Sequence, residues 1–270
     1  MKTMCNKVNH QEIIRLYENG ESLISIANRY EGLRHYHVDY ILRKHNIPKR
    51  SNKVNSRKYS LNHHFFDVVD SEEKAYWLGF IAADGYITTK ENIIGISLHH
   101  SDESHLEKFK KAINATYPVH QYRGSGYGGE VEYVRIAVRS DQVWKMLKEH
   151  GILENKSLIL TFPESIPPNF YLPFIRGYFD GDGSLSYYKK KDAYTVKIAG
   201  TKEMLEAITT ILGYPNRKLY KRYKNSTKNT YSVEIGGRRQ VVDVMNKLYH
   251  GATVYLERKH NRYLQLLQSS

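Results

Sequence analysis

Apolar residues recur at helical spacing in three short segments near the start of the chain. Residues 11–19 place their apolar side chains on one side and are followed by Gly20, so they predict a helix. Ser22 is suited to cap a second short helix, because its hydroxyl can accept a hydrogen bond from a free backbone N–H. Residues 35–45 predict a third helix that buries apolar residues at i, i+3 and i+4, namely Val38, Ile41 and Leu42.

The outer face of the third predicted helix is basic and aromatic. Its outward residues are expected to be Tyr36, Tyr40, Arg43 and Lys44. Short helices joined by a turn, the later one with such a face, describe a helix-turn-helix unit that contacts DNA. The run LYENGESLISIA at 16–27 resembles the helix-turn-helix domains of recombinases and repressors. The alternative for residues 1–48 is a small helical cap whose charges are only solvated.

Residues 49–60 are polar, basic and without periodicity, so they predict a linker. A linker of this kind can lie along the phosphates of a nucleic acid. The cations expected to do so are Lys49, Arg50, Arg57 and Lys58.

The remainder of the chain is an internal repeat. The nonamer WLGFIAADG at 77–85 aligns without a gap with IRGYFDGDG at 175–183. Each copy is followed by strand-like segments, an amphipathic helix, more strands and a further helix. The repeat predicts two halves, 61–165 and 166–270, related by a pseudo-two-fold axis within one chain.

Each nonamer is predicted to end a helix. Asp70 and Glu73 form a plausible capping box for the first helix, and Pro173 suits an early position in the second. Gly85 and Gly183 are expected to stop the two helices. Four small residues, spaced four apart in each copy, leave a face on which the other helix could approach closely: Gly79, Ala83, Gly177 and Gly181.

The candidate chemistry lies in Asp84 and Asp182, at matched positions of the two nonamers. A carboxylate at a helix C-terminus meets the negative end of the macrodipole, and two such groups side by side repel each other. Mg²⁺ would relieve that repulsion, because it commonly takes one or two protein carboxylates and completes its octahedron with water and phosphate oxygens. The alternative for each aspartate is an Asp-Gly turn with no further role.

Charge and composition favour a nucleic-acid partner. The chain has 41 Lys and Arg against 28 acidic residues, a net charge of +13, and residues 1–60 alone carry +7. Cys5 is the only cysteine, which excludes internal disulfides and cysteine zinc sites. No apolar run reaches membrane-spanning or signal-peptide length, so we expect a soluble, intracellular protein. The 13 histidines are scattered and do not support a His-Asn-His nuclease.

At the paired nonamers, the chain resembles the two-motif, single-chain LAGLIDADG homing endonucleases, from about residue 62 to the end. The resemblance implies an α+β fold of two αββαββα halves, a saddle of β-strands over double-stranded DNA, and cleavage of both strands with Mg²⁺ or Mn²⁺. It implies that Asp84 and Asp182 are the metal ligands. Ala82 replaces the first acidic residue of the motif, whereas the second copy keeps Asp180, at a position that is commonly not the metal ligand.

The resemblance also implies a basic residue near the phosphate in each half, which falls on Lys156 and Lys259. Their alternative is an ordinary surface charge. A polar side chain that positions water should fall near 99–101 and 199–201, where no clear equivalent stands out.

The strands after each nonamer are expected to read DNA. In the first half the candidates are Tyr86, Thr88, Lys90, Asn92, Arg123, Arg135 and Arg139. In the second half they are Ser184, Ser186, Tyr188, Lys189, Lys190, Asp192, Lys221, Arg222 and Lys224. Their alternative is a solvated strand face.

The sequence thus favours a site-specific double-strand DNA endonuclease that acts on a long asymmetric target. Two other functions stay open on the same scaffold: a DNA-binding regulator that does not cleave, and an RNA maturase of a group I intron. Because both half-sites lie in one chain, we expect a monomer.

Overall fold

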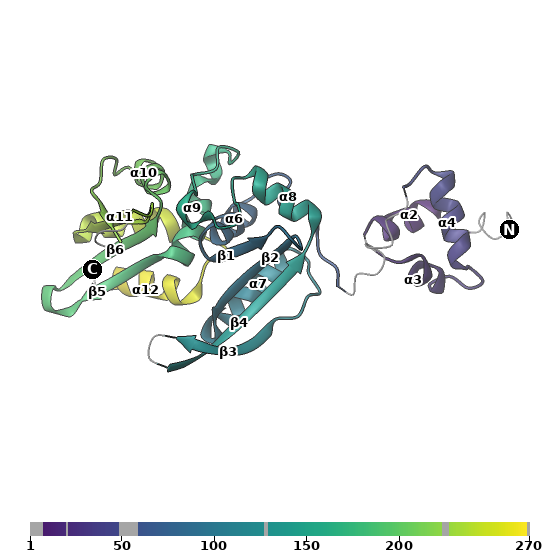
Figure 1. Cartoon of the computed structure of the whole chain (residues 1–270), viewed down its shortest axis with the longest axis horizontal. Helices are drawn as coiled ribbons and strands as arrows, with labels where there is room; N and C mark the ends of the chain where they lie inside the picture. Colours follow the sequence, from purple (N-terminus) through teal and green to yellow (C-terminus); the bar gives the residue numbers. More distant parts are fainter. Residues whose placement is uncertain (1–7, 20, 49–58, 127–128, 223–226, 269–270) are drawn as a thin grey trace. The chain divides into compact units, whose positions relative to one another are not determined.

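A computed structural model describes residues 8–19, 21–48, 59–126, 129–222 and 227–268 of the chain (Figure 1). These residues belong to two compact units, Met1–Ser60 and Leu61–Ser270, each with a hydrophobic core of its own. Four cations of the predicted linker, Lys49, Arg50, Arg57 and Lys58, lie outside the described residues. The linker therefore stays a prediction.

The described residues of the first unit contain three α-helices: α2 (His10–Glu18), α3 (Leu23–Asn28) and α4 (His35–Lys44). The Ser22 hydroxyl accepts a hydrogen bond from the backbone N–H of Ser25 at 3.0 Å, which confirms the predicted cap of α3. The apolar residues predicted to be buried in α4 are confirmed as well: Val38, Ile41 and Leu42. The helices are thus as predicted, whereas their assignment as a helix-turn-helix DNA-binding domain stays a prediction.

In the first half of the second unit, the described residues form α-helices and pairs of β-strands in alternation. In chain order they are α6 (Glu72–Asp84), β1 (Gly85–Thr88), β2 (Ile93–His99), α7 (Glu103–Ala112), β3 (His120–Gly126), β4 (Gly129–Arg139) and α8 (Asp141–Glu149). The strands form an antiparallel sheet in the order β1-β2-β4-β3.

The second half repeats this order. Its elements are α9 (Tyr171–Asp182), β5 (Gly183–Tyr188), β6 (Ala193–Gly200), α10 (Lys202–Ile211), β7 (Leu219–Lys221), β8 (Tyr231–Gly236) and α11 (Arg238–Tyr249), followed by α12 (Glu257–Gln268). The sheet order is β5-β6-β8-β7. The expected α+β fold of two αββαββα halves is confirmed.

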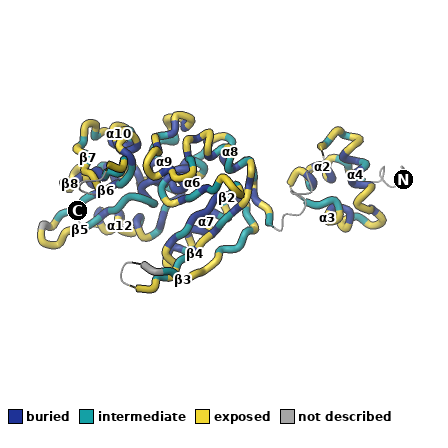
Figure 2. Tube along the Cα trace, in the orientation of Figure 1, coloured by how far each residue is buried: buried dark blue, intermediate teal, exposed yellow. Residues whose placement is uncertain are grey.

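Each sheet buries one face and leaves the other open, because successive side chains of a strand point to opposite sides. In the first sheet Ile87, Ile94 and Ile136 are buried, and α7 and α8 contact this face. In the second sheet Leu185 and Val196 are buried, and α10 and α11 contact that face. The strands are exposed at the tips of the hairpins (Figure 2). Tyr188, the last residue of β5, is exposed.

Helices α6 and α9 lie side by side where the two halves meet (Figure 1). A Cβ added at Gly79 would overlap the carbonyl oxygen of Phe174 and lie 2.9 Å from its carbonyl carbon. The second copy mirrors this contact, because a Cβ at Gly177 would overlap the carbonyl oxygen of Tyr76. The predicted close approach through small residues is therefore confirmed: backbone packs on backbone in both directions.

The ends of the two helices differ in part from the prediction. The N-cap of α6 is Ser71, whose hydroxyl accepts from the backbone N–H of Lys74 at 3.3 Å, so the capping box expected from Asp70 is wrong. Asp70 instead forms an ion pair with the Lys74 ammonium at 2.9 Å. Gly85 and Gly183 do follow the last helical residues, but their backbones are extended because each leads directly into a strand.

The helix crossing predicts that Gly79→Ala destabilises the second unit. The added methyl meets backbone rather than a movable side chain, so the two helices must separate, and overpacking of this kind costs about 3 kcal/mol in the free energy of unfolding. Denaturant unfolding of the full chain measures the change.

Gly236→Ala is the matched control, because Gly236 is exposed and an added Cβ there would have its nearest neighbour at 3.9 Å. It should alter the free energy of unfolding by less than about 1 kcal/mol. Equal stabilities of the two alanine variants would contradict the close crossing.

Candidate active site

Asp84 and Asp182 are the last residues of α6 and α9. A Cβ added at Gly181, the residue before Asp182, would lie 3.3 Å from the carboxyl carbon of Asp84. The helix crossing therefore brings the two predicted metal ligands to one place. Among the described residues, neither carboxylate has a hydrogen bond or an ion pair.

The protein environment raises the pKa of both carboxylates. Asp84 is exposed and Asp182 half-buried, yet the protein around them displaces water. This desolvation, together with repulsion from Asp182, raises the pKa of Asp84 to about 6. Desolvation also raises the pKa of Asp182, and the positive charges of Arg222, Lys156 and Lys259 partly offset that effect. Such a pair favours a bound cation.

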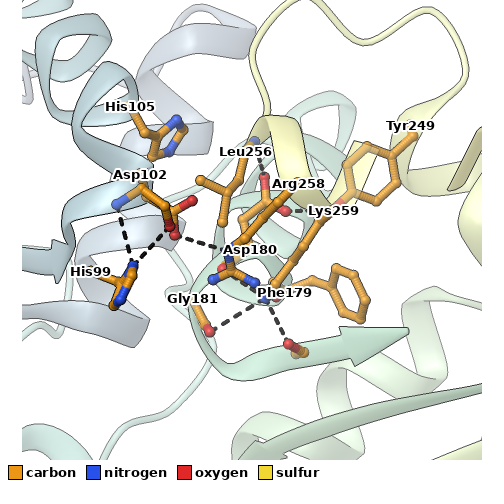
Figure 3. Close-up of polar contacts among 12 residues, drawn as sticks. His99, Asp102, His105, Phe179, Asp180, Gly181, Tyr249, Leu256, Arg258 and Lys259 are labelled. Atoms are coloured by element: carbon orange, nitrogen blue, oxygen red, sulfur yellow. Dashed lines mark hydrogen bonds and ion pairs between the residues drawn. The ribbon is translucent and has the colours of Figure 1, made fainter. Parts of the chain in front are cut away.

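The two predicted lysines are buried beneath the carboxylates, so the alternative of an ordinary surface charge is wrong. Lys156 lies in the short 3-10 helix η2 (Lys156–Leu158), and its ammonium donates to the carbonyl oxygen of Gly85. Lys259, in α12, donates to the carbonyl oxygens of Phe179 and Asp180 at 2.6 and 2.7 Å (Figure 3).

A third bond from the same ammonium reaches the carbonyl oxygen of Gly183 at 2.6 Å. The lysines thus satisfy the free carbonyls that end α6 and α9 and place positive charge at the negative ends of both helices. Burial lowers the pKa of both, that of Lys259 to about 8.

Asp180 has a structural role that the sequence did not indicate. Its carboxylate is fully buried and accepts a hydrogen bond from the Tyr76 hydroxyl at 2.7 Å. It accepts another from the Tyr249 hydroxyl (Figure 3). It also accepts from the backbone N–H of Leu256 at 2.8 Å. Asp180 therefore ties α9 to α6, to α11 and to the residue just before α12. The only sequence signal was that Ala82 occupies the matching position.

Residues 99–101 and 199–201 were expected to hold side chains that position water. They contain helix N-caps instead. The Nδ1 of His99 accepts from the backbone N–H of Ser101 at 3.2 Å, at the start of the 3-10 helix η1 (His100–Asp102). Thr201 is buried and caps α10, and its hydroxyl donates to the carbonyl oxygen of Leu160. Beside them, Arg258 binds the buried Asp102 at 2.8 Å and so links the two halves (Figure 3). No sequence motif indicates Arg258 or Asp102.

Most predicted DNA-reading residues of the first sheet share its open face. Counted by the pairing register, this side of the sheet carries Tyr86, Thr88, Arg135 and Arg139. With Lys90, in the turn after β1, three of these residues line a groove of about 450 Å³. Arg123 points to the other side and pairs with Glu132 at 3.1 Å.

The second sheet divides in the same way. Ser184, Ser186 and Tyr188 lie on its open face, opposite the buried Leu185. Lys221 faces the other way, and its ammonium donates to the carbonyl oxygen of Lys228 at 3.0 Å. The exposed Arg222, next along the chain, continues the strand on the open side, while Lys224 lies outside the described residues.

The alternation expected to continue past Thr88 and Tyr188 is wrong, because both strands end there. Lys90 and Asn92 lie in a turn, and Asn92 has a left-handed backbone with φ of 52°. Lys189 and Lys190 are exposed in the 3-10 helix η4 (Lys189–Lys191), and Asp192 has φ of 46°. These residues form hairpin tips rather than strand faces.

In the first unit, three of the four predicted contact residues are exposed: Tyr36, Arg43 and Lys44. Tyr40 is half-buried and packs against the core of the unit. Arg43 pairs with Asp39 one turn earlier. Among the described residues, no helix is long and apolar enough to cross a membrane.

The buried contacts of Asp180 predict that Asp180→Ala destabilises the second unit by about 3 kcal/mol, because two hydroxyls and one N–H lose their acceptor. Asp243→Ala is the control: Asp243 also accepts from a tyrosine and a lysine, but at the surface, so it should cost less than about 1 kcal/mol. Urea unfolding compares the two. A D180A chain as stable as the D243A chain would show that the buried carboxylate is dispensable.

Comparisons with known proteins found several similar solved structures. The homing endonuclease I-WcaI, bound to its DNA recognition sequence, superposes with a TM-score of 0.50 at 15% identity, over 71% of this chain and 87% of that one. The meganuclease I-SmaMI, bound to uncleaveable DNA, gives 0.48 at 12% identity over 73% and 90%. WhiA from Thermatoga maritima gives 0.46 at 18% identity over 77% and 64%.

At 15% identity and a TM-score of 0.50, the I-WcaI structure indicates the fold alone. No curated protein matches the sequence. The family model of the LAGLIDADG-like domain matches twice, over residues 71–151 and 169–249, which together make up more than half of the chain. Both matches contain one of the two nonamers and the strands that follow it. The chain therefore belongs to the LAGLIDADG-like domain family and carries two copies of its domain.

Proposed function

We propose that this protein is a site-specific endonuclease that cuts both strands of a long, asymmetric DNA target with the help of Mg²⁺ or Mn²⁺. The observation that carries the proposal is the convergence of Asp84 and Asp182 at the crossing of α6 and α9. The net charge of +13 and the two open sheet faces fit a double-stranded DNA partner.

The residues present fit a divalent ion. The carboxylate oxygens of Asp84 and Asp182 have no hydrogen bond or ion pair with another described residue. A bound cation would relieve the repulsion between the two carboxylates. The described residues contain no group of three or more His, Cys, Asp and Glu that could hold a metal. Water and phosphate oxygens would therefore complete the coordination, which suits Mg²⁺. When bound, the ion supplies Lewis-acid polarisation of the scissile phosphate and a more acidic water.

The chain's own residues prepare the place for this chemistry. The buried Lys156 and Lys259 hold the carbonyl ends of α6 and α9, so the two carboxylates keep a fixed separation. Their positive charge acts on both aspartates and would also favour a phosphate and the negative charge that develops on it. Polar and basic side chains on the open faces, such as Arg135 and Ser186, would bind base edges and phosphates.

We predict that Asp84→Asn and Asp182→Asn each slow cleavage at least about a hundredfold while affinity for DNA stays within a few-fold. The reason is that the amide loses the charge that holds the ion, whereas the sheet faces are untouched. Duplexes enriched from a random-sequence library by binding to the full chain in EDTA serve as substrate, and cleavage starts on addition of Mg²⁺.

Asp70→Asn is the matched control, because it removes the same charge just before the opposite end of α6. It should cleave at the parental rate. Normal cleavage by either D84N or D182N would refute the assigned role. A parent chain that binds the enriched duplex tightly but never nicks it would favour the non-cleaving regulator, and tighter binding to folded group I intron RNA than to duplex DNA would favour the maturase.

The first unit is proposed to add DNA contacts through α4. Replacing both Arg43 and Lys44 by Gln should weaken DNA binding about tenfold and reduce the slope of log K against log salt by about 2, because two phosphate contacts are lost. The control replaces Lys145 and Lys148, two exposed cations of α8, by Gln. If both double variants bind alike across the salt series, the first unit makes no phosphate contact through these residues.

A further inference from the structure

A cavity of about 140 Å³ lies beside Asp182. Both halves of the second unit build it, because its walls come from the ends of α6 and α9, from η2 and the segment after it, and from the strands of the second sheet. Six of its lining residues define it: Ala83, Ser157, Tyr178, Asp182, Gly200 and Arg222. The cavity therefore joins one candidate metal ligand to one arginine of the open sheet face.

Arg222 occupies the last described position of its strand before the turn. Its backbone N–H donates to the carbonyl oxygen of Thr230 at 3.1 Å, so the antiparallel pairing of β7 with β8 continues through it. The backbone is thus held in place while the side chain is exposed on the open side. Within the described part of the chain, its guanidinium forms neither a hydrogen bond nor an ion pair, although its charge acts on Asp182 more strongly than that of Lys156 or Lys259.

The first half has no arginine at the matching position. Counted across the ladders from Gly85 and Gly183, the place of Arg222 is taken by Tyr122, which stacks on Tyr133 at 5.5 Å between ring centres. The arginine that acts on Asp84 is instead Arg258, from α12, and the buried Asp102 already holds it. The two carboxylates therefore face different cations: Arg258 is paired with Asp102, whereas Arg222 has no ion pair among the described residues.

From this asymmetry we infer that Arg222 binds a phosphate oxygen of one DNA strand in the cavity beside Asp182 and promotes cleavage of that strand only. A guanidinium suits this task because its planar fork donates to two phosphate oxygens at once. The two strands are consequently cut by unequal centres, although the fold is nearly symmetric. The inference rests on the proposed nuclease function.

Arg222→Gln tests the inference when each strand of the enriched duplex carries a different end label. The protein concentration exceeds the DNA concentration and is high enough to saturate binding. Single-turnover rates in Mg²⁺ then report the cleavage of each strand apart from binding. We expect R222Q to slow one strand about tenfold or more and to leave the other within about twofold, so that nicked DNA accumulates. Arg222→Lys should restore part of the lost rate, because the charge returns without the fork.

Lys221→Gln is the matched control, because it removes the same charge from the neighbouring residue, which faces the other side of the sheet. Both strands should be cut at the parental rate in K221Q. If the parent chain cleaves, the inference is overturned when R222Q slows cleavage of both strands equally or slows neither. If the parent cuts neither strand, the proposed function fails, and this inference fails with it.

Discussion

The close crossing of α6 and α9 is the contact on which the rest of the structure depends. Gly79 and Gly177 each allow close contact with a backbone carbonyl oxygen of the other helix. This contact fixes where the two helices cross. The helices end at Asp84 and Asp182, and each then becomes the first strand of a sheet. One contact therefore sets both the separation of the carboxylates and the starting points of the two open sheet faces.

That arrangement has an electrostatic cost, which the neighbouring cations reduce. Two carboxylates stand at negative helix ends. Desolvation, together with repulsion from Asp182, raises the pKa of Asp84 to about 6. The ammonium groups of Lys156 and Lys259 donate hydrogen bonds to backbone carbonyl oxygens near the ends of the two helices. Their positive charge offsets the repulsion between the two carboxylates. They leave the carboxylate oxygens free, which is the condition for binding an ion from the solvent side.

Much of this could be predicted from the sequence, because the paired nonamers, the small residues within them and the alternation of the strands are local patterns. Asp180 could not be placed in that way. Its partners Tyr76, Tyr249 and Leu256 come from three distant segments, and only the folded chain shows that they share one carboxylate. The link from Arg258 to Asp102 was missed for the same reason.

Other differences between the predicted and the observed structure arose because an element was shifted by one residue. Ser71 rather than Asp70 caps α6, because the helix begins one residue later than the capping box required. Arg123 and Lys221 face away from the open side since a shift of one residue reverses the side of a strand. Composition and charge could not distinguish these alternatives, because both faces of an exposed hairpin are polar.

The central claim is that Asp84 and Asp182 hold a divalent ion beside the DNA backbone. A crystal structure of the full chain with an enriched duplex and Mn²⁺, with the metal located by its anomalous scattering, tests it most directly. The account predicts metal within about 2 Å of an oxygen of each carboxylate and of a phosphate oxygen. Duplex DNA seated on the sheets with metal bound elsewhere, or bound by neither aspartate, would contradict it.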